Sequence, residues 1–79
     1  METKVGNIKY DVEELQKDIA IIFAAMTRNG AMKQELQALR RTSLILDAIA
    51  GGMDARLTKT DIRHMKYYKR KYVDERVAS

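Results

Sequence analysis

The sequence contains no cysteine, no proline and no tryptophan, and its only histidine is His64. Without cysteine the chain can form no disulfide, and no thiolate is available to bind zinc. A single histidine also excludes a multi-histidine metal site. We therefore expect no metal and no other cofactor. The lack of cysteine is also compatible with a reducing, cytoplasmic setting.

Long apolar runs are missing as well. The longest, Ile19 to Met26, has eight residues, whereas a helix that spans a bilayer needs about 20. Residues 1–10 lack the apolar segment of a signal peptide. The sequence thus predicts a cytoplasmic protein that does not enter a membrane.

The chain has 79 residues, so we expect one domain, residues 1–79, near the size at which a single core is only just sufficient. Domains this small usually need a disulfide, a metal or a partner subunit. Because the composition excludes the first two, association of the chain with itself is the remaining means of stabilisation.

Residues that break helices are few. Four glycines are present, and the strong breaks after the N-terminus fall at Asn29-Gly30 and Gly51-Gly52. They divide the chain into predicted helices at about residues 8–28, 31–50 and 59–77. The predicted fold is all-α: a helical hairpin plus a third basic helix, assembling into a dimeric or higher helical bundle.

The first predicted helix carries an apolar stripe typical of a coiled coil, because its members are spaced alternately by three and four residues. The stripe consists of Val5, Ile8, Val12, Leu15, Ile19, Ile22 and Met26. We favour the seam of an antiparallel hairpin with the second helix. The alternative is the seam of a homodimer, and both coexist in a hairpin that dimerises into a four-helix bundle.

The second predicted helix repeats the same alternation from Met32 to Ala50, and further apolar residues widen both stripes. Such helices must be covered on more than one side, by the third helix, a second subunit or both. We expect the hairpin or oligomer core to contain Val12, Leu15, Ile19, Ile22, Phe23, Met26, Leu36, Leu39, Leu46 and Ile49.

The third predicted helix begins at a capping box, in which Thr58 and Asp61 satisfy each other's backbone N–H groups. Its apolar face is thin, so we expect it to be the least buried of the three. Residues 53–79 hold eight basic and four acidic side chains, and this excess accounts for the net charge of +4.

The cations of this helix lie on one side, because Lys59, Arg63, Lys66 and Arg70 are spaced by four, three and four residues. Basic side chains bind phosphates and tyrosines can stack on bases, although a charge run is often only a solvated face. The candidate binding residues for nucleic acid or an acidic partner are Lys59, Arg63, Lys66, Tyr67, Lys69, Arg70 and Lys71.

Three functional hypotheses follow. The leading one is a small homo-oligomeric protein, nucleic-acid-binding or regulatory, that contacts the phosphates of DNA or RNA. Its size and charge suit a phage or plasmid accessory protein. Such a protein would be found in the cytoplasm of the host cell. The alternative is a protein–protein adaptor, assembly factor or inhibitor that docks on an acidic partner. Neither requires enzyme activity, and no Ser/Asp or Cys pattern surrounds His64.

The third hypothesis rests on Ser43-Leu44-Ile45-Leu46-Asp47. This segment resembles the SQELD signature of the small aspartyl-phosphate phosphatases of sporulating bacilli, which also lies on the second helix of a hairpin. The resemblance covers about 30 residues and implies functional roles for Ser43 and Asp47. The chain departs from the family at Leu44 and Ile45, where the family has polar residues.

Overall fold

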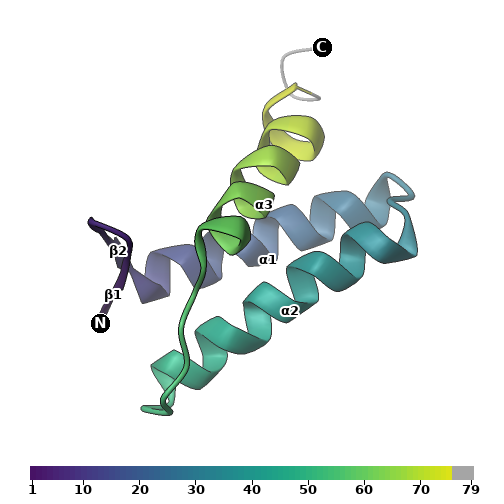
Figure 1. Cartoon of the computed structure of the whole chain (residues 1–79). Coiled ribbons are helices and arrows are strands. Elements are labelled where there is room, and N and C mark those ends of the chain that lie inside the picture. Colours follow the sequence, from purple (N-terminus) through teal and green to yellow (C-terminus); the bar gives the residue numbers. More distant parts are fainter. Residues whose placement is uncertain (76–79) are drawn as a thin grey trace.

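The computed structural model describes residues 1–75 as a short β-hairpin followed by three helices (Figure 1). Strand β1 (Glu2–Val5) pairs antiparallel with β2 (Ile8–Asp11), and Val5 lies opposite Ile8. Gly6 and Asn7 form the two-residue loop. A positive φ at Gly6, +64°, without one at Asn7 is the pattern of a type II′ turn, which suits the twist of paired strands.

The prediction that the first helix begins at about residue 8 is therefore wrong. The turn at Gly6-Asn7 reverses the chain, and Ile8 pairs with Val5 across the hairpin instead of following it along a helix. Val5 is buried in the core, whereas 56% of Ile8 is exposed. The helical apolar stripe thus begins only at Val12.

Helix α1 (Val12–Arg28) follows the hairpin without a linker. Asp11 ends β2 and also caps α1, because its carboxylate accepts a hydrogen bond from the Glu14 N–H at 3.2 Å. The Val12 N–H donates to the Met1 carbonyl at 2.8 Å, which extends the strand pairing to the first residue of the helix. The β-hairpin is therefore held against the N-terminal end of α1.

Helix α2 (Lys33–Ala50) lies beside α1 and runs antiparallel to it (Figure 1). The break between them falls where the sequence predicts it: Asn29 caps α1 and Gly30 takes a positive φ of +69°. α2 begins two residues later than the predicted residue 31. It ends at Ala50, as predicted; Gly51 is its C-cap, and Gly52 has a φ of +81°.

Helix α3 (Lys59–Lys69) continues as a π-helical turn, η1 (Arg70–Asp74), so regular α-helical hydrogen bonding ends earlier than predicted. Residues 76 and 77 of the predicted helix lie outside the described residues. α3 has the largest share of exposed residues, six of 11, against eight of 17 in α1 and eight of 18 in α2, in line with the thin apolar face that the sequence predicts. The apolar residues that it buries are Ile62 and Met65, and η1 adds Tyr72.

α3 packs across the helical hairpin and contacts both α1 and α2 (Figure 1). Leu57, just before α3, is buried with the residues of all three helices in one apolar cluster. One further helix thus covers the α1–α2 pair from one side. Within residues 1–75, no helix combines the length and the apolar character that crossing a bilayer requires.

Candidate functional site

The predicted cationic side chains of α3 and η1 all lie at the surface. Lys59, Arg63, Lys66, Lys69, Arg70 and Lys71 are exposed. Among residues 1–75, the only ion pair within 4.0 Å is that between Lys71 and Glu35. The other five cations therefore have no carboxylate partner within that distance in the described part of the chain, and their charge faces solvent.

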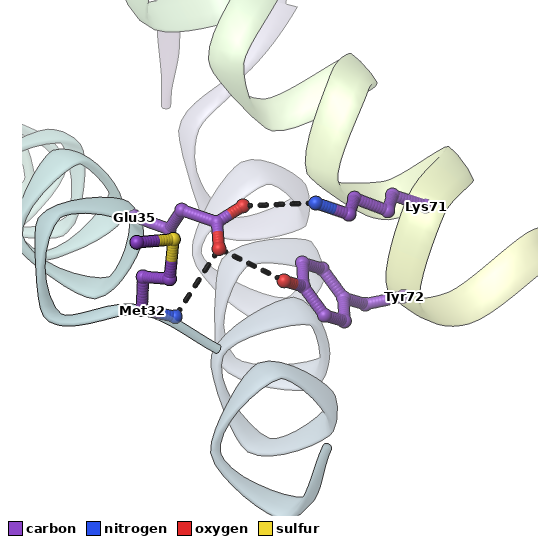
Figure 2. Close-up of polar contacts among 4 residues, drawn as sticks. All are labelled: Met32, Glu35, Lys71 and Tyr72. Atoms are coloured by element: carbon purple, nitrogen blue, oxygen red, sulfur yellow. Dashed lines mark hydrogen bonds and ion pairs between the residues drawn. The ribbon is translucent and has the colours of Figure 1, made fainter. Parts of the chain in front are cut away.

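Lys71 differs from the rest of the predicted set because it takes part in a polar cluster that joins η1 to α2 (Figure 2). Its Nζ lies 3.3 Å from one carboxylate oxygen of Glu35. The Tyr72 hydroxyl donates to the other oxygen at 3.0 Å, and the Met32 N–H donates to that same oxygen at 3.2 Å. The Glu35 side chain is only 15% exposed. Lys71 thus helps to fasten η1 to the start of α2.

The three donors change the acidity of Glu35. Partial burial alone would raise the pKa of this carboxyl, but the hydrogen bonds from Met32, Tyr72 and Lys71, together with the charge of Lys71, outweigh it and lower the pKa. In return, the hydrogen bond to Glu35 raises the pKa of Lys71. Both groups are therefore held in their charged forms at neutral pH.

Tyrosines surround this cluster. The rings of Tyr67 and Tyr68 meet edge to face, with centroids 5.0 Å apart, and Lys71 Nζ lies 5.9 Å from the Tyr67 centroid. Burial and the nearby charge of Glu35 raise the pKa of the Tyr68 hydroxyl. Of the two, Tyr67 is the one at the surface, with 56% of the residue exposed, which leaves its ring available for stacking.

An apolar groove of ≈ 300 Å³ lies between the β-hairpin, α1 and α3. Tyr10, Leu15, Ile22, Ile62 and Met65 contribute its apolar lining. Lys66 and Lys69 border it from α3, and Lys9 with the carboxylates of Asp11, Glu14 and Asp18 borders it from the other side. These acids weaken the positive potential around the two lysines. Lys59, Arg63 and Arg70 do not line the groove.

The first turn of α3 is anchored in the core. Thr58 and Asp61 form the predicted capping box: the Asp61 carboxylate accepts from the Thr58 N–H at 2.9 Å, and the Asp61 N–H donates to the Thr58 hydroxyl at 3.2 Å. Asp61 is 5% exposed, and its other oxygen accepts from the hydroxyl of Thr42 on α2 at 3.3 Å. The start of the cationic helix is thus fixed to α2.

The residues predicted for the core of the helical hairpin lie in the buried apolar cluster or pack against it. Val12, Ile19, Ile22, Met26, Leu39 and Leu46 are buried, and Leu15, Phe23, Leu36 and Ile49 are partly buried against them. Val5 and Ile8 belong to the strands. Ser43 and Asp47 line a second groove between α1 and α2, where Asp47 is exposed and accepts a hydrogen bond from the Gln16 amide at 3.0 Å.

Sequence reasoning missed Glu35, and with it the contacts that Lys71 and Tyr72 of η1 make with this carboxylate. A signal was present, because Glu35 stands three residues after Met32 at the start of α2, the position from which a glutamate reaches back to a helix N-terminus. Its contact with η1, 36 residues further along the chain, carries no local signal. Among residues 1–75, no group of three or more His, Cys, Asp or Glu side chains is placed to hold a metal ion.

Comparison of the chain with family models, with curated proteins and with solved structures gave no match.

Proposed function

We propose that this chain is a small homo-oligomeric, non-enzymatic protein that binds nucleic acid through the cations of α3 and η1. The observation that carries the proposal is the row of exposed cations without a carboxylate partner within 4.0 Å among residues 1–75. Unpaired lysines and arginines on one helix can neutralise phosphates and release counterions. The exposed ring of Tyr67 lies on the same helix and can stack on an unpaired base.

The cations differ in how much each can contribute to phosphate binding, because their surroundings differ. Lys71 is paired with Glu35, and Lys66 and Lys69 face the carboxylates across the groove. Lys59, Arg63 and Arg70 do not line this groove, although the end of the Lys59 side chain lies beside Gly6 of the β-hairpin. We therefore assign the main phosphate contacts to Lys59, Arg63 and Arg70, with Lys66 and Lys69 contributing less.

The experiment is a fluorescence anisotropy titration of labelled duplex and single-stranded DNA and RNA at several salt concentrations. If three phosphates are neutralised, log K should fall against log [salt] with a slope of about −3 on duplex DNA. Reversal of two charges, Arg63→Glu with Arg70→Glu, should abolish binding. Lys17→Glu with Lys33→Glu is the matched control, since it changes the net charge equally at exposed residues of α1 and α2.

Circular dichroism of each variant should show unchanged helicity, because none of the substituted side chains is buried. Absence of binding by the wild type at low salt refutes the proposal. So does equal loss of affinity in the control, since the effect would then report net charge and not the face of α3.

The groove between the hairpin, α1 and α3 supports a second candidate, an adaptor that docks on an acidic protein partner. Its apolar lining fits the apolar side chains of a peptide better than a sugar-phosphate backbone, and the acidic side chains of that peptide can reach Lys66 and Lys69 on the border opposite Asp11, Glu14 and Asp18. Lys66→Glu with Lys69→Glu should then abolish peptide binding, whereas Arg63→Glu with Arg70→Glu should not. The opposite ranking is expected for phosphate contacts.

The resemblance to the aspartyl-phosphate phosphatases supports a third, minor candidate, in which Ser43 and Asp47 act on a response regulator. Ser43→Ala with Asp47→Asn tests it directly. Unchanged activity of the protein in its host after both substitutions excludes this candidate.

A further inference from the structure

The second groove of the helical hairpin, ≈ 540 Å³ in volume, is lined by α1 and α2 alone. α1 contributes Gln16, Ile19, Ala20, Phe23 and Ala24, and α2 contributes Arg40, Ser43 and Asp47. Ala20 and Ala24 are exposed, and Phe23 is only partly buried. Apolar side chains therefore remain in contact with solvent along the middle of this groove.

This groove lies on the opposite side of the hairpin from α3. Glu14 and Asp18 of α1 line the first groove, which α3 also lines. Gln16 and Ala20 of α1 line the second groove. Residues two apart on a helix differ by about 200° in direction, so the two sets point to opposite sides of α1. No residue of the cationic helix reaches the second groove.

The two ends of this groove carry opposite charges. At one end Asp47 accepts a hydrogen bond from Gln16 at 3.0 Å. At the other end the Arg40 guanidinium lies over the Phe23 ring, 5.9 Å from its centroid. Asp47 and Arg40 are both exposed and stand seven residues apart on α2, about 10.5 Å along its axis.

Between these two charges lies Leu44, four residues after Arg40 and three before Asp47, so it shares their side of α2. Leu44 is 63% exposed. The surface thus has an apolar middle, formed by Leu44 and Ala20, with a cation at one end and an anion at the other.

We propose that a second copy of this chain covers this groove, related to the first by a two-fold axis perpendicular to the helices at the level of Ala20 and Ser43. Such an axis packs α1 against α1 and α2 against α2 of the other copy, each pair antiparallel. It places Asp47 of each copy beside Arg40 of the other, so the same ion pair forms twice. The two hairpins become a four-helix bundle with a self-complementary interface.

The charges select this arrangement over its main alternative. A two-fold axis parallel to the helices would bring the Asp47 ends of the two copies together and the Arg40 ends together, which like charges oppose. The antiparallel arrangement also places Leu44 of one copy near Leu44 of the other, close to the axis. Exposed apolar surface and charge complementarity therefore favour the same dimer.

The experiment measures the mass of the purified full chain by analytical ultracentrifugation across micromolar concentrations without nucleic acid. The wild type should be a dimer. Asp47→Arg and Arg40→Asp should each weaken dimerisation more than about tenfold, because each places like charges opposite one another. Arg41→Asp is the matched control: it makes the same charge change at the adjacent residue, which lies outside this groove, and should leave the dimer intact.

Mixing supplies the decisive measurement. An equimolar mixture of the Asp47→Arg and Arg40→Asp variants restores both ion pairs in the heterodimer, so the mixture should dimerise more tightly than either variant does alone. A double variant carrying both substitutions should also dimerise with itself. Rescue of this kind cannot arise from variants that merely fail to fold.

A wild type that stays monomeric at high micromolar concentration overturns the proposal. So does a dimer that Arg40→Asp and Arg41→Asp affect equally, or a mixture without rescue. None of these results depends on nucleic-acid binding, because no residue of the groove belongs to the cationic face of α3. The dimer specifies the homo-oligomer of the proposed function, and its failure is observed separately from failure of nucleic-acid binding.

Discussion

At the scale of the residue, Glu35 joins segments that are far apart in the sequence. Its carboxylate accepts hydrogen bonds from Met32 before α2 and from Lys71 and Tyr72 in η1. The same carboxylate therefore satisfies an N–H at the start of α2 and holds the far end of the cationic helix.

Removing this carboxylate should loosen η1. Glu35→Ala removes the acceptor of all three hydrogen bonds, and we expect it to lower the free energy of unfolding by about 1–2 kcal/mol. Glu35→Gln keeps a side-chain oxygen and should cost less. Urea denaturation followed by circular dichroism measures both, with Gln34→Ala at an exposed neighbour as the control. Equal stability of the Glu35→Ala and Gln34→Ala variants would contradict this role.

The charge of Glu35 also predicts a dependence of stability on pH. Because folding lowers the pKa of Glu35, the ionised carboxylate contributes stability that is fully present above the ordinary glutamate pKa of about 4.3. This contribution is lost as the pH falls through the lowered pKa of the folded state. Urea midpoints measured from pH 7 to pH 3 should fall more steeply for the wild type than for Glu35→Gln, and parallel curves would contradict the prediction.

At the scale of the element, the N-terminal hairpin and the first turn of α3 depend on specific local features. The hairpin requires a positive φ at Gly6, and a Cβ at that position would lie 3.1 Å from Cε of Lys59. α3 requires Asp61, which completes the capping box and accepts a hydrogen bond from Thr42.

Gly6→Ala should therefore destabilise the hairpin by about 1 kcal/mol, because an L residue resists positive φ and the new methyl displaces the flexible end of Lys59. Amide hydrogen exchange should show faster exchange within residues 2–12 while α2 is unaffected. Asn7→Ala is the control, since Asn7 is exposed and lacks a positive φ. Unchanged exchange in the Gly6→Ala hairpin would show that the strands do not depend on this turn.

Asp61→Ala should destabilise the chain by about 2 kcal/mol, because it removes the carboxylate that accepts from the Thr58 N–H in the capping box and from the buried hydroxyl of Thr42. Thr60→Ala, at the exposed residue beside it, should change stability by less than about 0.5 kcal/mol. Thermal unfolding followed by circular dichroism compares the two. A small effect of Asp61→Ala would mean that packing alone fixes α3.

At the scale of the whole molecule, the cationic face and the groove proposed for dimerisation lie on opposite sides of the helical hairpin. In the proposed dimer the two α3 helices therefore stand on opposite outer surfaces, and each can contact its own nucleic-acid strand. The assembly would bridge two segments of nucleic acid; it would not wrap around one.

Bridging has a direct measurement. Surface-immobilised duplex DNA should capture a second, labelled duplex when the wild type is added at low salt. Asp47→Arg should still bind DNA but lose the capture, because the monomer presents one cationic face, whereas Arg63→Glu with Arg70→Glu should lose both. If the Asp47→Arg variant still captures the second duplex, bridging does not depend on this dimer.

The helices α1 and α2 and the first turn of α3 could be predicted from local patterns, because periodic apolar residues, Gly30, Gly51 and the Thr58–Asp61 capping box act over a few residues. The N-terminal hairpin was missed for a specific reason. Val5 and Ile8 fit the helical spacing of the stripe that follows, while the turn signal in Gly6-Asn7 is only two residues long.

The sequence alone determined three helices, their breaks and a row of cations at helical spacing, since each depends on neighbouring residues. Tertiary structure decided which cations remain unpaired. Lys71 meets Glu35 across 36 residues, and Lys66 and Lys69 face acids from α1, because α3 crosses the hairpin at one particular angle and register. Packing between distant segments fixes that crossing, and no local pattern in the chain encodes it.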